Sequence, residues 1–222
     1  MNDGKQIGAK FNADGTPRKY PGNTILADVT PGQRSYATML YLRQALLSAG
    51  LAPLFILLPE DSFHMTVIRG MNDQVRTEAF WPPSLAKDAP MEQVDDALEK
   101  AFLAVAAPEK LTMRFSHVQI NEEDFRVCLE PEDEQQWRKL RAYRDAIADH
   151  LGLRLAGHDA YTFHITQAYT WHLPSQAQSD ALSAYAHSMN LYLAAQPAFM
   201  IGTPYAAFYR DMVQFYPHRI QR

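Results

Sequence analysis

Two stretches of the chain nearly repeat each other: SFHMTV at residues 62–67 and TFHITQ at residues 162–167. Both read hydroxyl, Phe, His, apolar, Thr, inside runs of apolar and aromatic residues that are typical of strands. On a strand, residues two positions apart point to the same face. We therefore expect the His and Thr of each copy to share one face, with the Phe on the opposite face holding the strand to a core.

Helices and strands are predicted in a similar order around each copy. Amphipathic patterns indicate the helices, with Gly50, Gly152 and an N-terminal cap at Ser175 as boundary signals. Apolar runs and alternating patterns indicate strands, followed by two or three short strands near the C-terminus. The helices are expected at 34–50, 91–107, 132–152 and 175–196, and the strands at 24–27, 53–59, 62–70, 110–120, 124–130 and 160–171.

This arrangement predicts an α+β fold with two pseudo-symmetric lobes of antiparallel sheet, outer helices and a central cleft. The two copies, at 62–67 and 162–167, indicate an internal duplication. No linker rich in Pro or Gly separates the halves, so residues 1–222 are expected to form a single compact domain. Residues 1–35 are rich in turn formers. They are read as a loop that either covers part of a site or forms a floppy tail.

Charge and composition limit the partners. The formal net charge of −4 leaves no strongly basic face for a long nucleic-acid duplex. Cys128 is the single cysteine, so an intrachain disulfide is excluded, and we expect a buried, inert thiol. The polar N-terminus and the absence of a run of about 20 apolar residues predict a cytoplasmic protein that does not enter a membrane. Nothing in the sequence requires more than a monomer.

Two imidazoles and two hydroxyls aimed at one point suit phosphate chemistry. A neutral His can take a proton from an attacking water, and a charged His on the other side can protonate the leaving oxygen. His64 and His164 are the candidates for these roles, and which of them is the acid stays open. The hydroxyls of Thr66 and Thr166 can donate to the non-bridging phosphate oxygens. This chemistry requires neither a metal nor a cofactor.

The paired His-x-Thr motifs, His64-Met65-Thr66-Val67 and His164-Ile165-Thr166-Gln167, resemble the signature of the two-histidine (2H) phosphoesterase superfamily. Gln167 departs from the apolar residue usual at the fourth position. The resemblance implies a pseudo-twofold protein with a water-filled cleft. It also implies metal-independent opening or formation of 2′,3′-cyclic phosphates or related cyclic nucleotide esters. The substrate would then be a small nucleotide or a short RNA end, processed by a cyclic phosphodiesterase.

Five further residues are candidates for substrate contacts. Arg69 and Tyr169 each follow a motif His by five positions, an odd offset that points away from the cleft unless a bulge intervenes. A guanidinium or a phenol beside a phosphate is chemically sensible. Tyr209 and Arg210 lie near a turn, and Tyr36 opens the first helix. Their aromatic rings can stack on a base, although each one singly is also suited to core packing.

Three alternatives remain beside the phosphodiesterase. A non-catalytic protein would hold a nucleotide or phosphate in the same two-histidine pocket. A metal-dependent hydrolase would use the region from His158 to His172, where spacings match no common zinc pattern. An RNA-end ligase is disfavoured by the acidic net charge.

Overall fold

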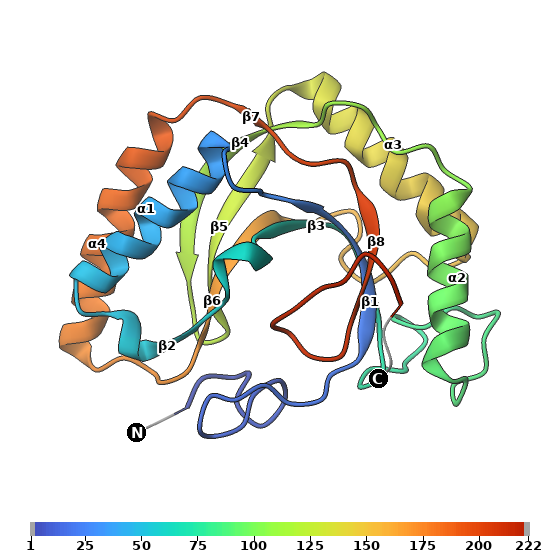
Figure 1. The fold of residues 1–222 in the computed structure, drawn as a ribbon, viewed down its shortest axis with the longest axis horizontal. Helices are drawn as coiled ribbons and strands as arrows, with labels where there is room; N and C mark the ends of the chain where they lie inside the picture. The colour runs from blue at the N-terminus through green and yellow to red at the C-terminus, as the bar shows by residue number, and fades with distance from the viewer. Residues whose placement is uncertain (1–2, 220–222) are drawn as a thin grey trace.

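The computed structural model describes residues 3–219, and its central feature is one curled antiparallel sheet with helices on its outer side (Figure 1). The strand order is β7-β4-β5-β6-β3-β1-β8, and β2 pairs with β6. The strands are β1 (Gly22–Asp28), β2 (Phe55–Leu57), β3 (His64–Asn72), β4 (Thr112–Ile120), β5 (Asp124–Pro131), β6 (Phe163–Thr170), β7 (Phe199–Met200) and β8 (Tyr205–Tyr209).

Four helices cover this sheet in two pairs (Figure 1). Each pair takes one helix from each half of the sequence: α1 lies beside α4, and α2 beside α3. The two halves are therefore interlocked around a largely continuous apolar core, and the predicted α+β class with two related lobes is confirmed. The helices are α1 (Arg34–Ser48), α2 (Met91–Leu103), α3 (Glu134–Leu151) and α4 (Gln176–Ala194).

Local signals account for several helix ends. Ser175 accepts a hydrogen bond from the backbone N–H of Gln178, whose side chain bonds back to Ser175 N–H, so the predicted cap is a full capping box. Gly152 ends α3 with a φ of +61°, a left-handed conformation that glycine adopts at little cost. Among residues 3–219, no helix combines the length and apolar character that a membrane crossing requires.

The order of elements repeats once β2 and β4 are set aside. The series β1-α1-β3-α2 is then followed by β5-α3-β6-α4, and in each series the first strand pairs with the motif strand. The two motif strands, β3 and β6, pair with each other at the centre of the sheet through Met65 and Ile165. The fold therefore brings the two copies of the repeated motif, residues 62–67 and 162–167, side by side.

Candidate active site

One cavity of about 310 Å³ lies over the central strands, and both motifs contribute to its wall. His64 and Thr66 of β3 and His164 and Thr166 of β6 all line it, and all four side chains are half-buried. Their neighbours Phe63 and Phe163 are buried in the core, as the strand alternation predicts. The structure thus collects the four predicted polar side chains in one place.

The two imidazoles are held in equivalent ways. Nδ1 of His64 lies 2.7 Å from the carbonyl oxygen of Ser62, and Nδ1 of His164 lies 2.8 Å from that of Thr162. Because a carbonyl oxygen only accepts hydrogen bonds, each Nδ1 must carry the hydrogen. Nε2 of each ring is left for chemistry in the cavity.

Both motif strands carry a bulge directly after the Thr. In the pairing of β1 with β3, Ile25 and Leu26 face Ile68 and Thr66, which leaves Val67 as an extra residue. In the pairing of β5 with β6, the extra residue is Gln167. A bulge reverses the alternation of the residues that follow it.

The bulges explain how the residues at odd offsets reach the site. Arg69 and Tyr169 both line the cavity, at equivalent positions in the two copies. Gln167, which departs from the expected apolar pattern, is fully buried, and its side-chain amide donates to the carbonyl of Met39 in α1 at 2.8 Å. This position therefore anchors β6 to α1.

Neighbouring charges distinguish the two histidines. Burial lowers the pKa of His164 to about 4, and the guanidinium of Arg126 adds to this effect. Burial also lowers the pKa of His64, but the Ser62 carbonyl and the Asp28 carboxylate oppose the shift. Asp28 lies opposite His64 in the pairing of β1 with β3, whereas Cys128 takes the equivalent place opposite His164. The neighbouring carboxylate of Asp28 therefore favours the charged form of His64, whereas the neighbouring guanidinium of Arg126 disfavours that of His164.

Residues missed at the sequence level complete the wall. Arg126 lies opposite Thr166 on β5, and its Nε donates to the buried carboxylate of Asp124 at 2.6 Å. Tyr161 also lines the cavity; burial raises the pKa of its phenol, and Arg144 and Thr66 oppose the shift. The alternation of residues 124–130 predicts that Asp124 and Arg126 share one face of their strand. The sequence does not show which strand lies next to it, so it could not place these two residues beside Thr166.

The N-terminal segment, residues 3–21, contributes Lys10 and Tyr20 to the cavity wall. Figure 1 shows this segment as a series of loops before β1. Its backbone is docked on the end of β6, where Gly4 N–H donates to the carbonyl of Trp171 at 2.9 Å. Phe11 is fully buried against Tyr169, and Lys10 and Tyr20 reach the cavity. The described part of the segment is therefore an ordered cover, one of the two readings that the sequence allowed.

Lys10 is the unexpected group in this cover. Its Nζ lies 5.0 Å from the centroid of the Tyr169 ring and 5.8 Å from that of Tyr20. Burial lowers its pKa to about 8, although Asp124 and Glu123 attract the charge. The loop composition of residues 1–35 carried no signal for this lysine.

C-terminal residues also line the cavity, next to the N-terminal segment. Tyr209 lines the cavity, and the ring of Phe215 lies 4.5 Å from that of His64. Two candidates for substrate contacts lie elsewhere. Arg210 is exposed and outside the cavity wall, and Tyr36 packs on the core residue Phe63, with ring centroids 5.9 Å apart.

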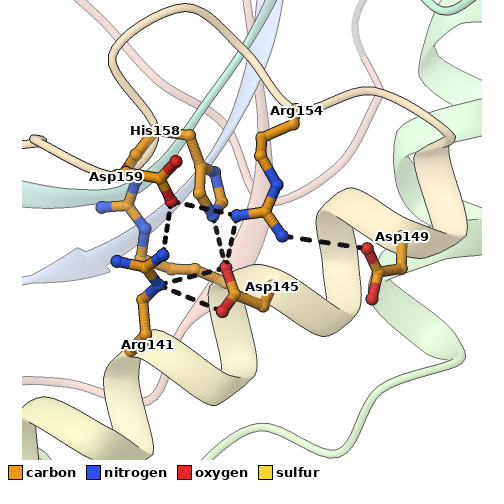
Figure 2. Close-up of polar contacts among 7 residues, drawn as sticks. Arg141, Asp145, Asp149, Arg154, His158 and Asp159 are labelled. Carbon is orange, nitrogen blue, oxygen red and sulfur yellow. Dashed lines mark hydrogen bonds and ion pairs between the residues drawn. The ribbon is translucent and has the colours of Figure 1, made fainter.

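The region proposed as an alternative metal site forms an ion-pair network instead (Figure 2). Within residues 3–219, Asp145, His158 and Asp159 are the one cluster spaced to share a cation. However, Arg141 and Arg154 already pair with both carboxylates.

The two carboxylates are already neutralised by arginines, so they are poor ligands for a metal ion. Burial alone would raise the pKa of Asp145, but hydrogen bonds from His158, Arg141 and Arg154 hold it down to about 2. His172, the other histidine of this alternative, lies beside Asp3 and stacks on Trp171. The geometry therefore supports a structural role, with the network fastening the loop after α3 to that helix.

Comparisons with known proteins agree with the fold. A family model described as "2H-phosphodiest: Domain of unknown function (DUF1868)" matches residues 10–123, just over half of the chain. No curated protein sequence matches significantly.

Two solved structures are similar. The conserved protein of unknown function ATU0111 from Agrobacterium tumefaciens str. C58 has a TM-score of 0.86 and 24% identity, over 97% of this chain and 91% of that one. TT0787 of Thermus thermophilus has a TM-score of 0.44 and 13% identity, over 84% and 85% of the two chains, which is too weak to carry an argument. The first likeness supports the fold alone.

Proposed function

The chain belongs to the 2H-phosphodiest family, and we propose that it hydrolyses a 2′,3′-cyclic or related cyclic phosphate of a nucleotide or short RNA end. One observation carries the proposal: two imidazoles, each fixed through Nδ1, line one cavity together with two Thr hydroxyls. The family membership supports a phosphodiesterase in general, and the geometry supports the choice of a reaction that needs two proton transfers.

In the proposed reaction, a water molecule attacks phosphorus while the bond to one ribose oxygen breaks. Nε2 of one His takes the proton of the water, and Nε2–H of the other gives a proton to the leaving ribose oxygen. The product is a phosphate monoester with one free hydroxyl. The two imidazoles exchange roles in the reverse direction, and the proton balance is complete without a metal.

Electrostatics favours His164 as the base and His64 as the acid. A base must be neutral before the reaction, and burial together with Arg126 keeps His164 neutral above a pKa of about 4. An acid must hold its proton; burial lowers the pKa of His64, and the Ser62 carbonyl and the Asp28 carboxylate oppose that shift. The cationic Arg126 and the hydroxyls of Thr66 and Thr166 would stabilise the negative charge that develops on the phosphate oxygens.

The cavity suits a small substrate. A volume of 310 Å³ is at the lower end of the range for small-molecule sites. Tyr20, Tyr169 and Phe215 offer aromatic faces on which a nucleobase can stack.

The test is turnover of the four nucleoside 2′,3′-cyclic phosphates by the wild type and by His64→Ala and His164→Ala, made singly. Each substitution is expected to lower kcat by about 10²- to 10⁴-fold, because each removes one proton transfer. His187→Ala, at an exposed position on α4, is the matched control and is expected to act as the wild type. Unchanged turnover in either active-site variant would refute the proposal.

The same experiment separates the enzyme from a binding protein. Tight binding of cyclic phosphates by the wild type without any turnover would favour the non-catalytic alternative. Prior treatment with a chelator is expected to leave kcat unchanged, and a loss of activity restored by a divalent metal would favour a metal-dependent hydrolase.

A further inference from the structure

A second cavity, of about 270 Å³, adjoins the first on the side of His164. The two cavities share four wall residues: Arg69, Arg126, Tyr161 and His164. The second cavity adds Arg144 from α3. A ligand that occupies the first cavity can therefore extend past His164 into the second.

The wall of this second cavity is strongly cationic. It contains three arginines and no Asp or Glu. Within residues 3–219, Arg69 is stacked on the ring of Phe80 at 4.9 Å and pairs with no carboxylate. Arg126 shares its charge with Asp124, which lies in the wall of the first cavity. The net field in the second cavity thus favours an anion.

Arg144 is the most unusual of the three. Its side chain is only 4% exposed, and its guanidinium carbon lies 4.7 Å from the Tyr161 ring centroid and 5.1 Å from that of Phe163. One Nη donates to the carbonyl of His158 at 2.8 Å, but the buried Nε has no partner in the described part of the chain. A buried cation with an unused donor is costly unless a ligand completes its bonds.

The other half of the molecule provides an internal comparison. Arg43 of α1 stacks on Phe63 at 4.8 Å, as Arg144 of α3 does on Phe163. Arg43 also has an acidic partner, Glu60, at 3.8 Å. Both arginines leave Nε without a partner within residues 3–219, but no carboxylate in that range pairs with Arg144, so the two copies differ in their acidic partner.

The loop after α3, which forms part of the wall of the second cavity, is fixed in place without a ligand. Asp145 on α3 accepts hydrogen bonds from His158 and Arg154, and Asp159 pairs with Arg141 (Figure 2). These contacts fasten the loop after α3 over the side chain of Arg144. A site on a fixed frame binds a ligand with little cost of ordering.

We propose that the second cavity is a subsite for a second phosphate group on the substrate, held by Arg69, Arg126 and Arg144. The forked N–H donors of arginine match the oxygens of a phosphate better than a single ammonium does. This inference rests on the proposed function, since it assumes that the first cavity holds the reacting phosphate. The substrate class becomes a cyclic phosphate that carries a further phosphate, as in a 5′-phosphorylated nucleoside 2′,3′-cyclic phosphate.

The experiment compares kcat/KM for two substrates: a nucleoside 2′,3′-cyclic phosphate and the same compound with a 5′-phosphate. The wild type is expected to prefer the second by about tenfold or more, the gain typical of charged hydrogen bonds. Arg144→Gln is expected to remove most of this preference. Arg69→Gln changes an exposed residue and tests the same subsite where folding is not at risk. Arg138→Gln, at an exposed position on α3 that pairs with Glu134 and lies outside this cavity, is the matched control and should keep the preference.

The experiment distinguishes an error in the proposed second subsite from an error in the proposed phosphodiesterase activity. Turnover of both substrates with equal kcat/KM would overturn the second subsite and leave the phosphodiesterase intact. If neither substrate is turned over, calorimetry with adenosine 2′-phosphate and adenosine 2′,5′-bisphosphate still decides. Tighter binding of the bisphosphate, lost in Arg144→Gln and Arg69→Gln, supports the subsite, and equal binding overturns it.

Discussion

His64 and His164 sit in equivalent positions but beside opposite charges, and this difference has a consequence for pH. If His164 is the base, kcat/KM should rise as the pH passes its pKa of about 4. If His64 is the acid, kcat/KM should fall as the pH passes its pKa, which burial holds below the usual value of 6.5. We expect a bell-shaped profile with its optimum on the acidic side of 6.5, measured with a nucleoside 2′,3′-cyclic phosphate.

The substitution Asp28→Asn tests which limb of the pH profile, rising or falling, reports the titration of which imidazole. Loss of the carboxylate removes a group that raises the pKa of His64. The falling limb should therefore move to lower pH while the rising limb stays in place. Asp61→Asn, at a nearby exposed carboxylate, should move neither limb. A shift of the rising limb in Asp28→Asn would reverse the assignment of acid and base.

Lys10→Met separates binding from stability. Burial lowers the pKa of this lysine to about 8, so the surroundings disfavour its charged form at pH 7. The free energy of unfolding should therefore increase, by about 1 kcal/mol after allowance for partial exposure. KM for a cyclic phosphate should rise several-fold, because a cation is lost from the cavity wall. Lys5→Met, at an exposed lysine of the same segment, should leave KM unchanged. A destabilised variant with normal KM would contradict this account.

At the scale of elements, the N-terminal segment depends on one close approach. A Cβ on Gly4 would lie 2.0 Å from the carbonyl oxygen of Thr170 in β6, so this backbone contact tolerates no side chain. Gly4→Ala is expected to detach the segment from the sheet and withdraw Lys10 from the cavity. Limited proteolysis should then cut within residues 3–21, and KM should rise while the thermal transition of the remaining core persists. Resistance to proteolysis with unchanged KM would show that docking does not depend on Gly4.

The loop after α3 should respond to acid. The pKa of Asp145 is lowered to about 2, so its ion pairs stabilise the folded state above the ordinary pKa near 3.8. That contribution is lost as the pH falls through about 2. Asp145→Asn should remove about 1 kcal/mol of the free energy of unfolding at pH 7, since the side chain is partly exposed and screened. The difference between the variant and the wild type should shrink below about pH 3, as chemical denaturation at several pH values would reveal. A constant difference would contradict the role of the ionised carboxylate.

At the scale of the molecule, the repeated motif predicts which side chains of the two central strands share a face. Alternation along a strand is local, so the shared face of His64 and Thr66, and of His164 and Thr166, follows from the residues alone. The bulges at Val67 and Gln167 depend on pairing with β1 and β5, and local sequence does not determine that pairing. For this reason the orientations of Arg69 and Tyr169 stayed open.

The sequence could not predict the site residues that reach the cavity only through the pairing of strands and the packing of loops. Arg126 meets Thr166 only through the register of β5 on β6, and Lys10 reaches the site because its loop folds back onto the end of β6. Arg144 resembles an ordinary residue of an amphipathic helix until the loop after α3 covers it. Tyr36 and Arg210 show the converse: their chemistry suited a phosphate site, but their elements point them elsewhere.

The central claim is that the two imidazoles flank one phosphorus atom. A crystal structure of the protein with a nucleoside 2′-phosphate, the expected product, tests it most directly. The account predicts that Nε2 of His64 and Nε2 of His164 each lie within hydrogen-bonding reach of the phosphate group, on opposite sides, with the hydroxyls of Thr66 and Thr166 on its remaining oxygens. A phosphate that binds in this cavity without contact to both imidazoles, or that binds elsewhere, would contradict the account.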